Sequence, residues 1–216
     1  MKSLFIDTAT DTGVVGLFED GVAIGKREFP AAFTNSKLLL PTIMELISSV
    51  QALGFIGVGI GPGSYTGCRV AVATAKGLAF GGKLPLVGIS TLRGFVPDSG
   101  FEGAFLAVID ARIGGMYCLR GEVRQGDAHF QGEEELLSLE EFHEAAAKVA
   151  CIVTPTADVL KKRLPDLKVE IVERTPCLEQ YGKLSYRAFL EGKGRLDGAL
   201  QLLYLRKTQA EIEKNI

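Results

Sequence analysis

The sequence is poor in the residues that build metal and disulfide sites. Its 216 residues include no tryptophan, two histidines and four cysteines. His129 and His143 are far apart and have no neighbouring histidine or cysteine to complete a ligand set, which argues against a metal site on this chain. The cysteines form no Cys-x-x-Cys pair and are too sparse for a disulfide scaffold. We therefore expect reduced thiols at Cys68, Cys118, Cys151 and Cys177.

The sequence also lacks a charge bias and a long apolar run. Its 24 basic and 26 acidic residues leave a formal net charge of -2, which provides no basic surface for holding nucleic-acid phosphates. Asp7 interrupts the apolar start before a signal-peptide core could form, and no later stretch reaches membrane-spanning length. With 47% hydrophobic residues, the chain has enough apolar surface for its own core. These features favour a cytoplasmic protein without a membrane partner.

Hydrophobic periodicity predicts the order βββαβαβ in the first half of the chain. Three strands joined by short turns form an antiparallel meander, and alternating helices and strands follow it. The predicted strands cover residues 4–6, 14–18, 22–29, 55–60 and 86–89, and the predicted helices cover residues 36–50 and 66–80.

The same pattern begins again near residue 106. Leu106–Asp110 echoes Leu4–Asp7, and each segment places an acid at the end of a strand; residues 115–119 echo residues 13–17 in the same way. Further strands are predicted at 123–130, 151–154 and 169–172, and helices at 139–149, at 158–163 and beyond 178.

A tandem pair of such units predicts an α/β protein of two small lobes. A meander followed by alternating helices and strands requires a mixed sheet covered by helices. Its duplication resembles the actin-like ATPase superfold, the ASKHA class that includes Hsp70 and sugar kinases. We place the lobes at residues 1–100 and 101–216. The alternative is a single doubly wound domain whose second half is unrelated.

The turn after the first strand reads Asp7-Thr8-Ala9-Thr10. In actin-like folds this turn usually combines an acid, a glycine and a hydroxyl, because backbone amides must come close to a nucleotide phosphate. Here the acid and both hydroxyls remain, but the glycine is missing. Asp7, Thr8 and Thr10 therefore form either a vestigial phosphate loop or a turn in which Asp7 and Thr10 bond the local backbone.

A glycine-rich loop spans residues 59–67, between a predicted strand and a predicted helix. A Walker A loop would need glycine at Thr66 followed by Lys-Ser or Lys-Thr, and a hydrolase elbow would need glycine at Pro62 and Thr66. The loop is thus either an anion site at a helix N-terminus or a tight turn in which Ser64 or Thr66 caps the helix. The sequence offers no Ser/His/acid or Cys/His arrangement, so we predict no catalytic residues.

Both predicted helices of the first lobe are more apolar than one core-facing stripe requires. The second helix also places Gly67, Ala71, Ala75 and Ala79 four residues apart, a row of small side chains that lets another backbone approach. We predict a partner or dimer interface on these helices; the alternative is burial against their own sheet. The predicted interface residues are Leu39, Leu40, Ile43, Met44, Ile47, Gly67, Val70, Ala71, Thr74, Ala75 and Leu78.

Ordered motifs along the chain resemble the TsaB (YeaZ) family. They are Ile6–Thr10, Gly59–Arg69, Ala73–Ala79, Pro85–Leu92, Ile109–Tyr117 and Tyr204–Arg206. The sequence departs from the family at Thr34–Lys37, where the histidine that usually precedes the Leu-Leu-Leu-Pro stretch is missing, and residues 121–196 match only loosely.

The resemblance implies a non-catalytic subunit of the machinery that makes tRNA N6-threonylcarbamoyladenosine. Such a subunit contacts the catalytic subunit TsaD, or itself as a homodimer, through the two apolar helices, and the ATPase TsaE joins the complex. The resemblance further implies ATP and metal on the partner subunits, no cofactor on this chain, and contact with tRNA only through the complex. Two alternatives remain open: an ATPase or glycoprotease-like enzyme of the same fold, and a protein-interaction module unrelated to tRNA.

Overall fold

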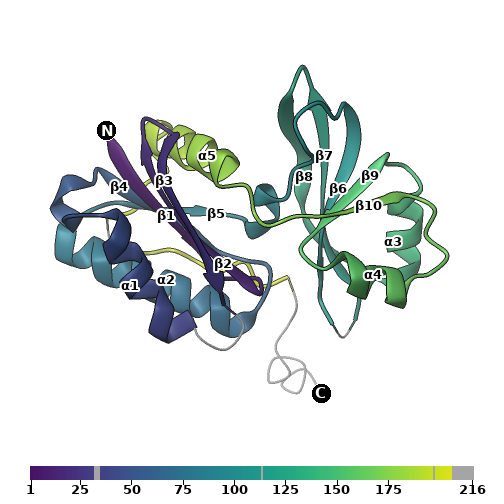
Figure 1. The fold of residues 1–216 in the computed structure, drawn as a ribbon, viewed down its shortest axis with the longest axis horizontal. Coiled ribbons are helices and arrows are strands. Elements are labelled where there is room, and N and C mark those ends of the chain that lie inside the picture. Colours follow the sequence, from purple (N-terminus) through teal and green to yellow (C-terminus); the bar gives the residue numbers. More distant parts are fainter. Residues whose placement is uncertain (32–34, 113, 197, 206–216) are drawn as a thin grey trace.

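The computed structural model describes residues 1–31, 35–112, 114–196 and 198–205. Figure 1 shows two lobes side by side, each built on one sheet with helices packed against it. Each sheet has five strands. Within the described ranges, no helix is both long enough and apolar enough to cross a membrane.

The first sheet has the strand order β3-β2-β1-β4-β5. β1 pairs antiparallel with β2 and parallel with β4, so the predicted meander and the later parallel strands form one mixed sheet. Helices α1 and α2 lie beside each other on one face of this sheet (Figure 1). The elements are β1 (Lys2–Asp7), β2 (Thr12–Glu19), β3 (Val22–Pro30), α1 (Asn35–Leu46), β4 (Phe55–Gly59), α2 (Tyr65–Gly82) and β5 (Leu86–Ile89).

The second sheet repeats this arrangement with the order β10-β9-β6-β7-β8. Its meander again pairs antiparallel, and β9 and β10 again run parallel to the first strand of the unit. The duplicated α/β fold predicted from the echo of Leu4–Asp7 in Leu106–Asp110 is therefore confirmed. The elements are β6 (Gly103–Asp110), β7 (Met116–Arg124), β8 (Asp127–Leu137), α3 (Leu139–Ala146), β9 (Cys151–Thr154), α4 (Ala157–Arg163) and β10 (Glu170–Glu173).

Several predicted elements have different bounds in the structure, and among them the helix predicted at 139–149 ends at Ala146. The strand predicted at 123–130 is interrupted by a hairpin, because Gln125 and Gly126 take left-handed φ values of 54° and 79°. The helix predicted at 36–50 ends at Leu46. Ser49 Oγ then accepts a hydrogen bond from Gln51 N and begins a separate 3-10 turn, η1 (Val50–Ala52).

The last helix among the described residues, α5 (Leu178–Leu190), packs on the first lobe rather than completing the second. Its Leu178 and Tyr181 join Phe5 and Phe18 in an apolar cluster on the face of the first sheet opposite α1 and α2. That face is apolar and needs a cover, and α5 provides one. The prediction that the helices beyond residue 178 complete the second copy is therefore wrong, while the lobe boundary at residues 100 and 101 stays a prediction.

The second sheet is also covered on both faces. Helices α3 and α4 pack on one face, around Phe142 and Leu160. The link between the lobes, which includes η2 (Thr91–Gly94), covers the other face with Leu92 and Phe95. The carboxyl ends of β1, β4 and β5 in the first sheet lie at one edge, where the glycine-rich loop and this link begin.

Candidate functional site

Asp7, at the carboxyl end of β1, is buried and fully engaged by its own chain. Oδ1 accepts a hydrogen bond from Ala9 N at 2.8 Å, and Oδ2 accepts one from Thr91 Oγ1 at 2.8 Å. The Tyr181 hydroxyl lies 3.0 Å from Asp7 Oδ2. Burial raises the pKa of the Asp7 carboxyl, and these hydrogen bonds act in the opposite direction.

The Tyr181 hydroxyl links this carboxyl to the link segment and to α5. Its oxygen lies 2.7 Å from the Thr91 carbonyl oxygen, closer than to Asp7. The hydroxyl has one hydrogen, which it donates between two acceptors, the Thr91 carbonyl oxygen and Asp7 Oδ2. Burial also raises the pKa of Tyr181 well above its ordinary value. The arrangement joins β1, η2 and α5, and it offers no exposed general base.

The turn after Asp7 closes directly onto the glycine-rich loop. Thr8 Oγ1 donates to the Gly67 carbonyl at 2.7 Å, and Ser64 N donates to the Ala9 carbonyl at 2.7 Å. A Cβ atom on Gly67 would lie 1.9 Å from the Thr8 carbonyl oxygen. The two loops therefore touch through their own backbones.

Local hydrogen bonds settle how both loops are held. Thr10 Oγ1 donates to the Thr12 carbonyl at 2.9 Å, so Asp7 and Thr10 make the local backbone bonds expected of a satisfied turn. Ser64 Oγ accepts from Gly67 N at 3.2 Å, which confirms the predicted cap at the start of α2. Whether Asp7, Thr8 and Thr10 descend from a phosphate loop stays a hypothesis.

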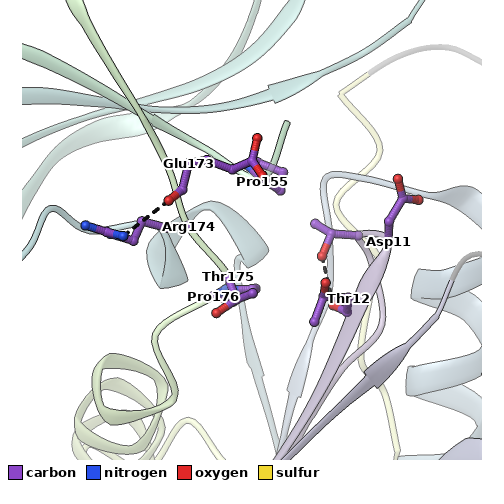
Figure 2. A pocket seen from close by; sticks show the side chains of 8 residues that line it. Asp11, Thr12, Pro155, Glu173, Arg174, Thr175 and Pro176 are labelled. Atoms are coloured by element: carbon purple, nitrogen blue, oxygen red, sulfur yellow. Dashed lines mark hydrogen bonds between the residues drawn. The ribbon is translucent and has the colours of Figure 1, made fainter. Parts of the chain in front are cut away.

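A pocket of about 230 Å³ lies between the lobes (Figure 2). Glu173 Oε2 accepts from Ala157 N at 2.8 Å, and Arg174 pairs with Asp98. The pocket thus has two carboxylates, Asp11 and Glu173, and its one guanidinium, that of Arg174, is already paired with Asp98. Such a lining repels phosphate groups. Its residues are Thr10, Asp11, Thr12, Pro155, Glu173, Arg174, Thr175 and Pro176.

Most residues of this pocket were missed at the level of sequence. Only Thr10 belongs to a sequence motif described above. The five pocket residues of the second lobe come from the segment that matches the family loosely; they are Pro155, Glu173, Arg174, Thr175 and Pro176. The available signal was topological: Pro155 follows β9, and Arg174 follows β10, at the carboxyl edge of parallel strands where open α/β sheets bind ligands. In the described part of the chain, no three His, Cys, Asp or Glu side chains are grouped to hold a metal ion.

Six of the predicted interface residues lie inside the core of the first lobe. The row of small residues on α2 faces the first sheet, and at Gly67 the backbone of Thr8 in the same chain comes close. These residues are buried against their own sheet in the free chain, and the interface on the two helices stays a prediction. The buried residues are Leu39, Ile43 and Ile47 on α1, and Gly67, Ala71 and Ala75 on α2.

The other predicted interface residues reach solvent. Leu40 is 49% exposed and Met44 is 52% exposed, although both are large and apolar. The structure adds Phe80, which is 89% exposed, and a second row of small residues, Ala73, Gly77 and Gly81, that sequence reasoning missed. We call this surface the helical face; it comprises Leu40, Met44, Val70, Ala73, Thr74, Gly77, Leu78, Phe80 and Gly81.

The helical face has space for a close contact. A Cβ atom on Gly77 or Gly81 would meet nothing within 4 Å, so the α2 backbone is open there. Ala73, Gly77 and Gly81 are four residues apart in the sequence, and so are the residues of the row that includes Gly67. The spacing therefore does not show which of the two rows is exposed. Only burial separates the two rows.

A cluster of Tyr65, Arg69 and Tyr204 lies at the N-terminal end of α2. The Arg69 guanidinium carbon lies 3.9 Å from the centroid of the Tyr65 ring, and Arg69 Nε donates to the Tyr204 hydroxyl at 3.1 Å. Tyr204 is brought there by a segment whose Leu203 N donates to the Ile60 carbonyl at 2.9 Å. Two residues of the family motifs, Ile113 and Arg206, lie outside the described residues, as does Thr34 of the segment that departs from the family.

Comparison with known proteins identifies relatives over both lobes. The family model TsaD, described as tRNA N6-adenosine threonylcarbamoyltransferase, matches residues 31–154. The tRNA threonylcarbamoyladenosine biosynthesis protein TsaB of Escherichia coli is 29% identical over 225 residues, 97% of this chain and 96% of that protein. The Haemophilus influenzae protein of the same name is 36% identical over 149 residues, 62% of this chain and 61% of that protein.

Two solved structures from Pseudomonas aeruginosa share the fold. One, a protein with similarity to the peptidase YeaZ, has a TM-score of 0.81 and 25% identity, and the match covers 95% of this chain and 99% of that one. The other, YeaZ, has a TM-score of 0.76 and 24% identity, with coverages of 94% and 99%. Both matches extend over the two lobes.

Proposed function

Since the chain belongs to the family matched by the TsaD model and, within it, to the TsaB (YeaZ) proteins of tRNA threonylcarbamoyladenosine biosynthesis, we propose that it is a non-catalytic partner subunit in that synthesis. It docks onto a TsaD-type catalytic subunit through the helical face. Its contribution is to hold that subunit in an active arrangement, and it performs no transfer itself.

The exposure of the helical face is the observation that carries this proposal. Leu40, Met44 and Phe80 expose large apolar side chains on two adjacent helices, next to the open backbone of Gly77 and Gly81. Large apolar side chains exposed on neighbouring helices favour an interaction site. A partner that covers it removes the apolar side chains from water and packs closely against α2.

The carboxyl edge of the first sheet supports a non-catalytic role. Asp7 is occupied by three partners of its own chain, and the loops that would surround a phosphate contact each other directly. The pocket between the lobes presents Asp11 and Glu173, which disfavour a nucleotide. We therefore propose that ATP and metal are bound by the partner subunits rather than by this chain.

The remaining partners follow from the same proposal. A TsaE-type ATPase joins the complex, and two copies of this chain can associate through the helical face when the catalytic subunit is absent. With a net charge of -2, the chain contacts tRNA through the complex rather than alone. We propose that the assembly works in the cytoplasm.

Reconstitution tests the proposed function. Unmodified tRNA is incubated with a TsaD-type subunit from the same organism, a TsaE-type ATPase, ATP, bicarbonate, threonine and the enzyme that makes the adenylate, with and without this chain. Nucleoside mass spectrometry then measures threonylcarbamoyladenosine. We expect the product to be lost or strongly reduced when the chain is omitted.

The same reaction carries its own control. The chain alone, supplied with every small molecule but without the TsaD-type subunit, is expected to yield no modified nucleoside. Equal product with and without the chain, together with no detectable complex, would contradict the proposal and favour an interaction module unrelated to tRNA. Product made by the chain alone would favour an enzyme.

A further inference from the structure

The helical face is flanked by positive charge. Helices α1 and α2 carry three basic residues, Lys37, Arg69 and Lys76, and α2 contains no acidic residue. The single acid of the two helices, Glu45, pairs with Arg27 of β3, whose Nε lies 2.9 Å from Glu45 Oε2. The chain as a whole carries a net charge of -2, so this local excess runs against the overall balance.

Helical spacing places these cations beside the apolar residues. Lys37 and Met44 are seven residues apart and share one side of α1, and Arg69 and Lys76 share one side of α2 in the same way. Lys37 and Arg69 are exposed, and Lys76 is half-buried. The cations therefore lie along both helices, at the rim of the helical face.

The rim charges are uncompensated in the described part of the chain. No carboxylate there forms an ion pair with Lys37, Arg69 or Lys76. Arg69 contacts Tyr65 and Tyr204, which hold its guanidinium in place without neutralising it. A fixed, unpaired cation next to an apolar patch is available for a carboxylate of a docking protein.

From this pattern we infer that the helical face selects a different protein with an acidic rim over a second copy of itself. The inference rests on the proposed function, in which this face docks onto a TsaD-type subunit, and adds the charge of the surface that it recognises. Apart from Glu45, which pairs with Arg27, the charges of the two helices are positive, so two copies bring cation against cation. A partner with carboxylates around an apolar centre pairs with all three.

The two associations are then expected to respond to salt in opposite directions. Ions screen rim charges over about 8 Å at physiological ionic strength. Binding to the acidic-rimmed partner weakens as salt is added, because its attraction is screened. Self-association strengthens with added salt, because its repulsion is screened.

A matched pair of charge reversals tests the inference. Lys37→Glu/Lys76→Glu changes the rim, and Lys161→Glu/Lys168→Glu makes the same change of charge at exposed positions of the second lobe. Calorimetry measures binding to the TsaD-type subunit at low and high sodium chloride, and sedimentation equilibrium measures self-association. We expect the rim variant to lose on the order of tenfold in affinity at low salt, to lose its salt dependence, and to self-associate no less than the wild type. The control variant is expected to bind as the wild type does.

The outcomes separate the two proposals. If the wild type binds the TsaD-type subunit but the rim variant binds equally well at every salt concentration, the charge inference is overturned and the proposed function stands. Self-association of the wild type that weakens with added salt also overturns the inference. If the wild type fails to bind at any salt concentration, the proposed function falls, and the inference falls with it.

Discussion

Met44→Glu is the most direct perturbation of the helical face. Met44 is 52% exposed on α1, so a glutamate there remains in contact with water in the free chain. Substitution at such a site usually changes the free energy of unfolding by about 1 kcal/mol or less. We therefore expect the variant to fold normally.

In the complex the same side chain is buried against the partner. A carboxylate held in an apolar contact without a partner costs about 3 kcal/mol or more. Since about 1.4 kcal/mol corresponds to a tenfold change in an equilibrium constant, affinity is expected to fall on the order of a hundredfold. Ala71→Glu would not serve this purpose, because Ala71 is fully buried in the first-lobe core and a charge there unfolds the protein.

The assay is calorimetric binding to the TsaD-type subunit, with circular dichroism to verify folding. Val159→Glu is the matched control, because Val159 is an apolar residue of similar exposure, 48%, on α4 of the second lobe. It is expected to bind as the wild type does. A folded Met44→Glu protein with unchanged affinity would refute the assignment of the helical face as the contact, whatever the reconstituted reaction shows.

Three further predictions concern two glycines of α2, the buried carboxyl of Asp7 and two buried thiols. Gly67→Ala is expected to lower the free energy of unfolding by about 3 kcal/mol, because its Cβ would lie 1.9 Å from the Thr8 carbonyl oxygen. Gly77→Ala is expected to raise it by about 0.5–1 kcal/mol, because a Cβ there meets nothing within 4 Å and alanine favours the helix. Urea titrations measure both changes. Burial raises the pKa of Asp7, so the folded state binds this proton more tightly than the unfolded state; the resulting stability is present below the ordinary pKa of 3.8 and is lost as pH rises through the folded value. Urea unfolding across this range is therefore expected to show a smaller loss of stability with rising pH for Asp7→Asn than for the wild type, and equal slopes would contradict the burial argument. Burial raises the pKa of Cys68 to about 12 and that of Cys151 to about 11, so both thiols are expected to resist iodoacetamide at neutral pH while the native fold persists. Mass spectrometry of labelled peptides measures the modification, and early labelling of either cysteine in the folded protein would contradict this prediction.

The strands and their order could be predicted because their signals are local. The predicted bounds of 86–89 and 151–154 agree with β5 and β9, since each strand is a short apolar run that ends before a polar residue or turn. The meander and its repetition needed only turn residues and buried runs. These features require no knowledge of distant parts of the chain.

The placement of α5 and the burial of Asp7 could not be predicted in this way. The periodicity of Leu178, Tyr181 and Ala188 shows that α5 has an apolar side, but it does not say which sheet that side covers. Thr91 and Tyr181, which hold Asp7, are 84 and 174 residues away from it. Such contacts depend on tertiary packing rather than on local pattern.

The interface prediction could not separate core from surface for a related reason. A row of small residues predicts that another part of a protein packs closely against the helix, but it does not identify that part. The Gly67 row meets the chain's own Thr8, whereas the row that contains Gly77 meets nothing in the described structure. Sequence periodicity is the same for both rows, so only the position of the sheet distinguishes core from surface.

The path of α5 has a consequence for biosynthesis on the ribosome. The second sheet is assembled from the contiguous residues 103–173, whereas the first sheet keeps Phe5 and Phe18 uncovered until α5 emerges. At about 5–20 residues per second, the roughly 100 residues between β5 and the end of α5 take on the order of 5–20 s to translate. During that interval the nascent chain presents an aromatic surface to chaperones, and the lobe that is made first is the lobe that finishes folding last.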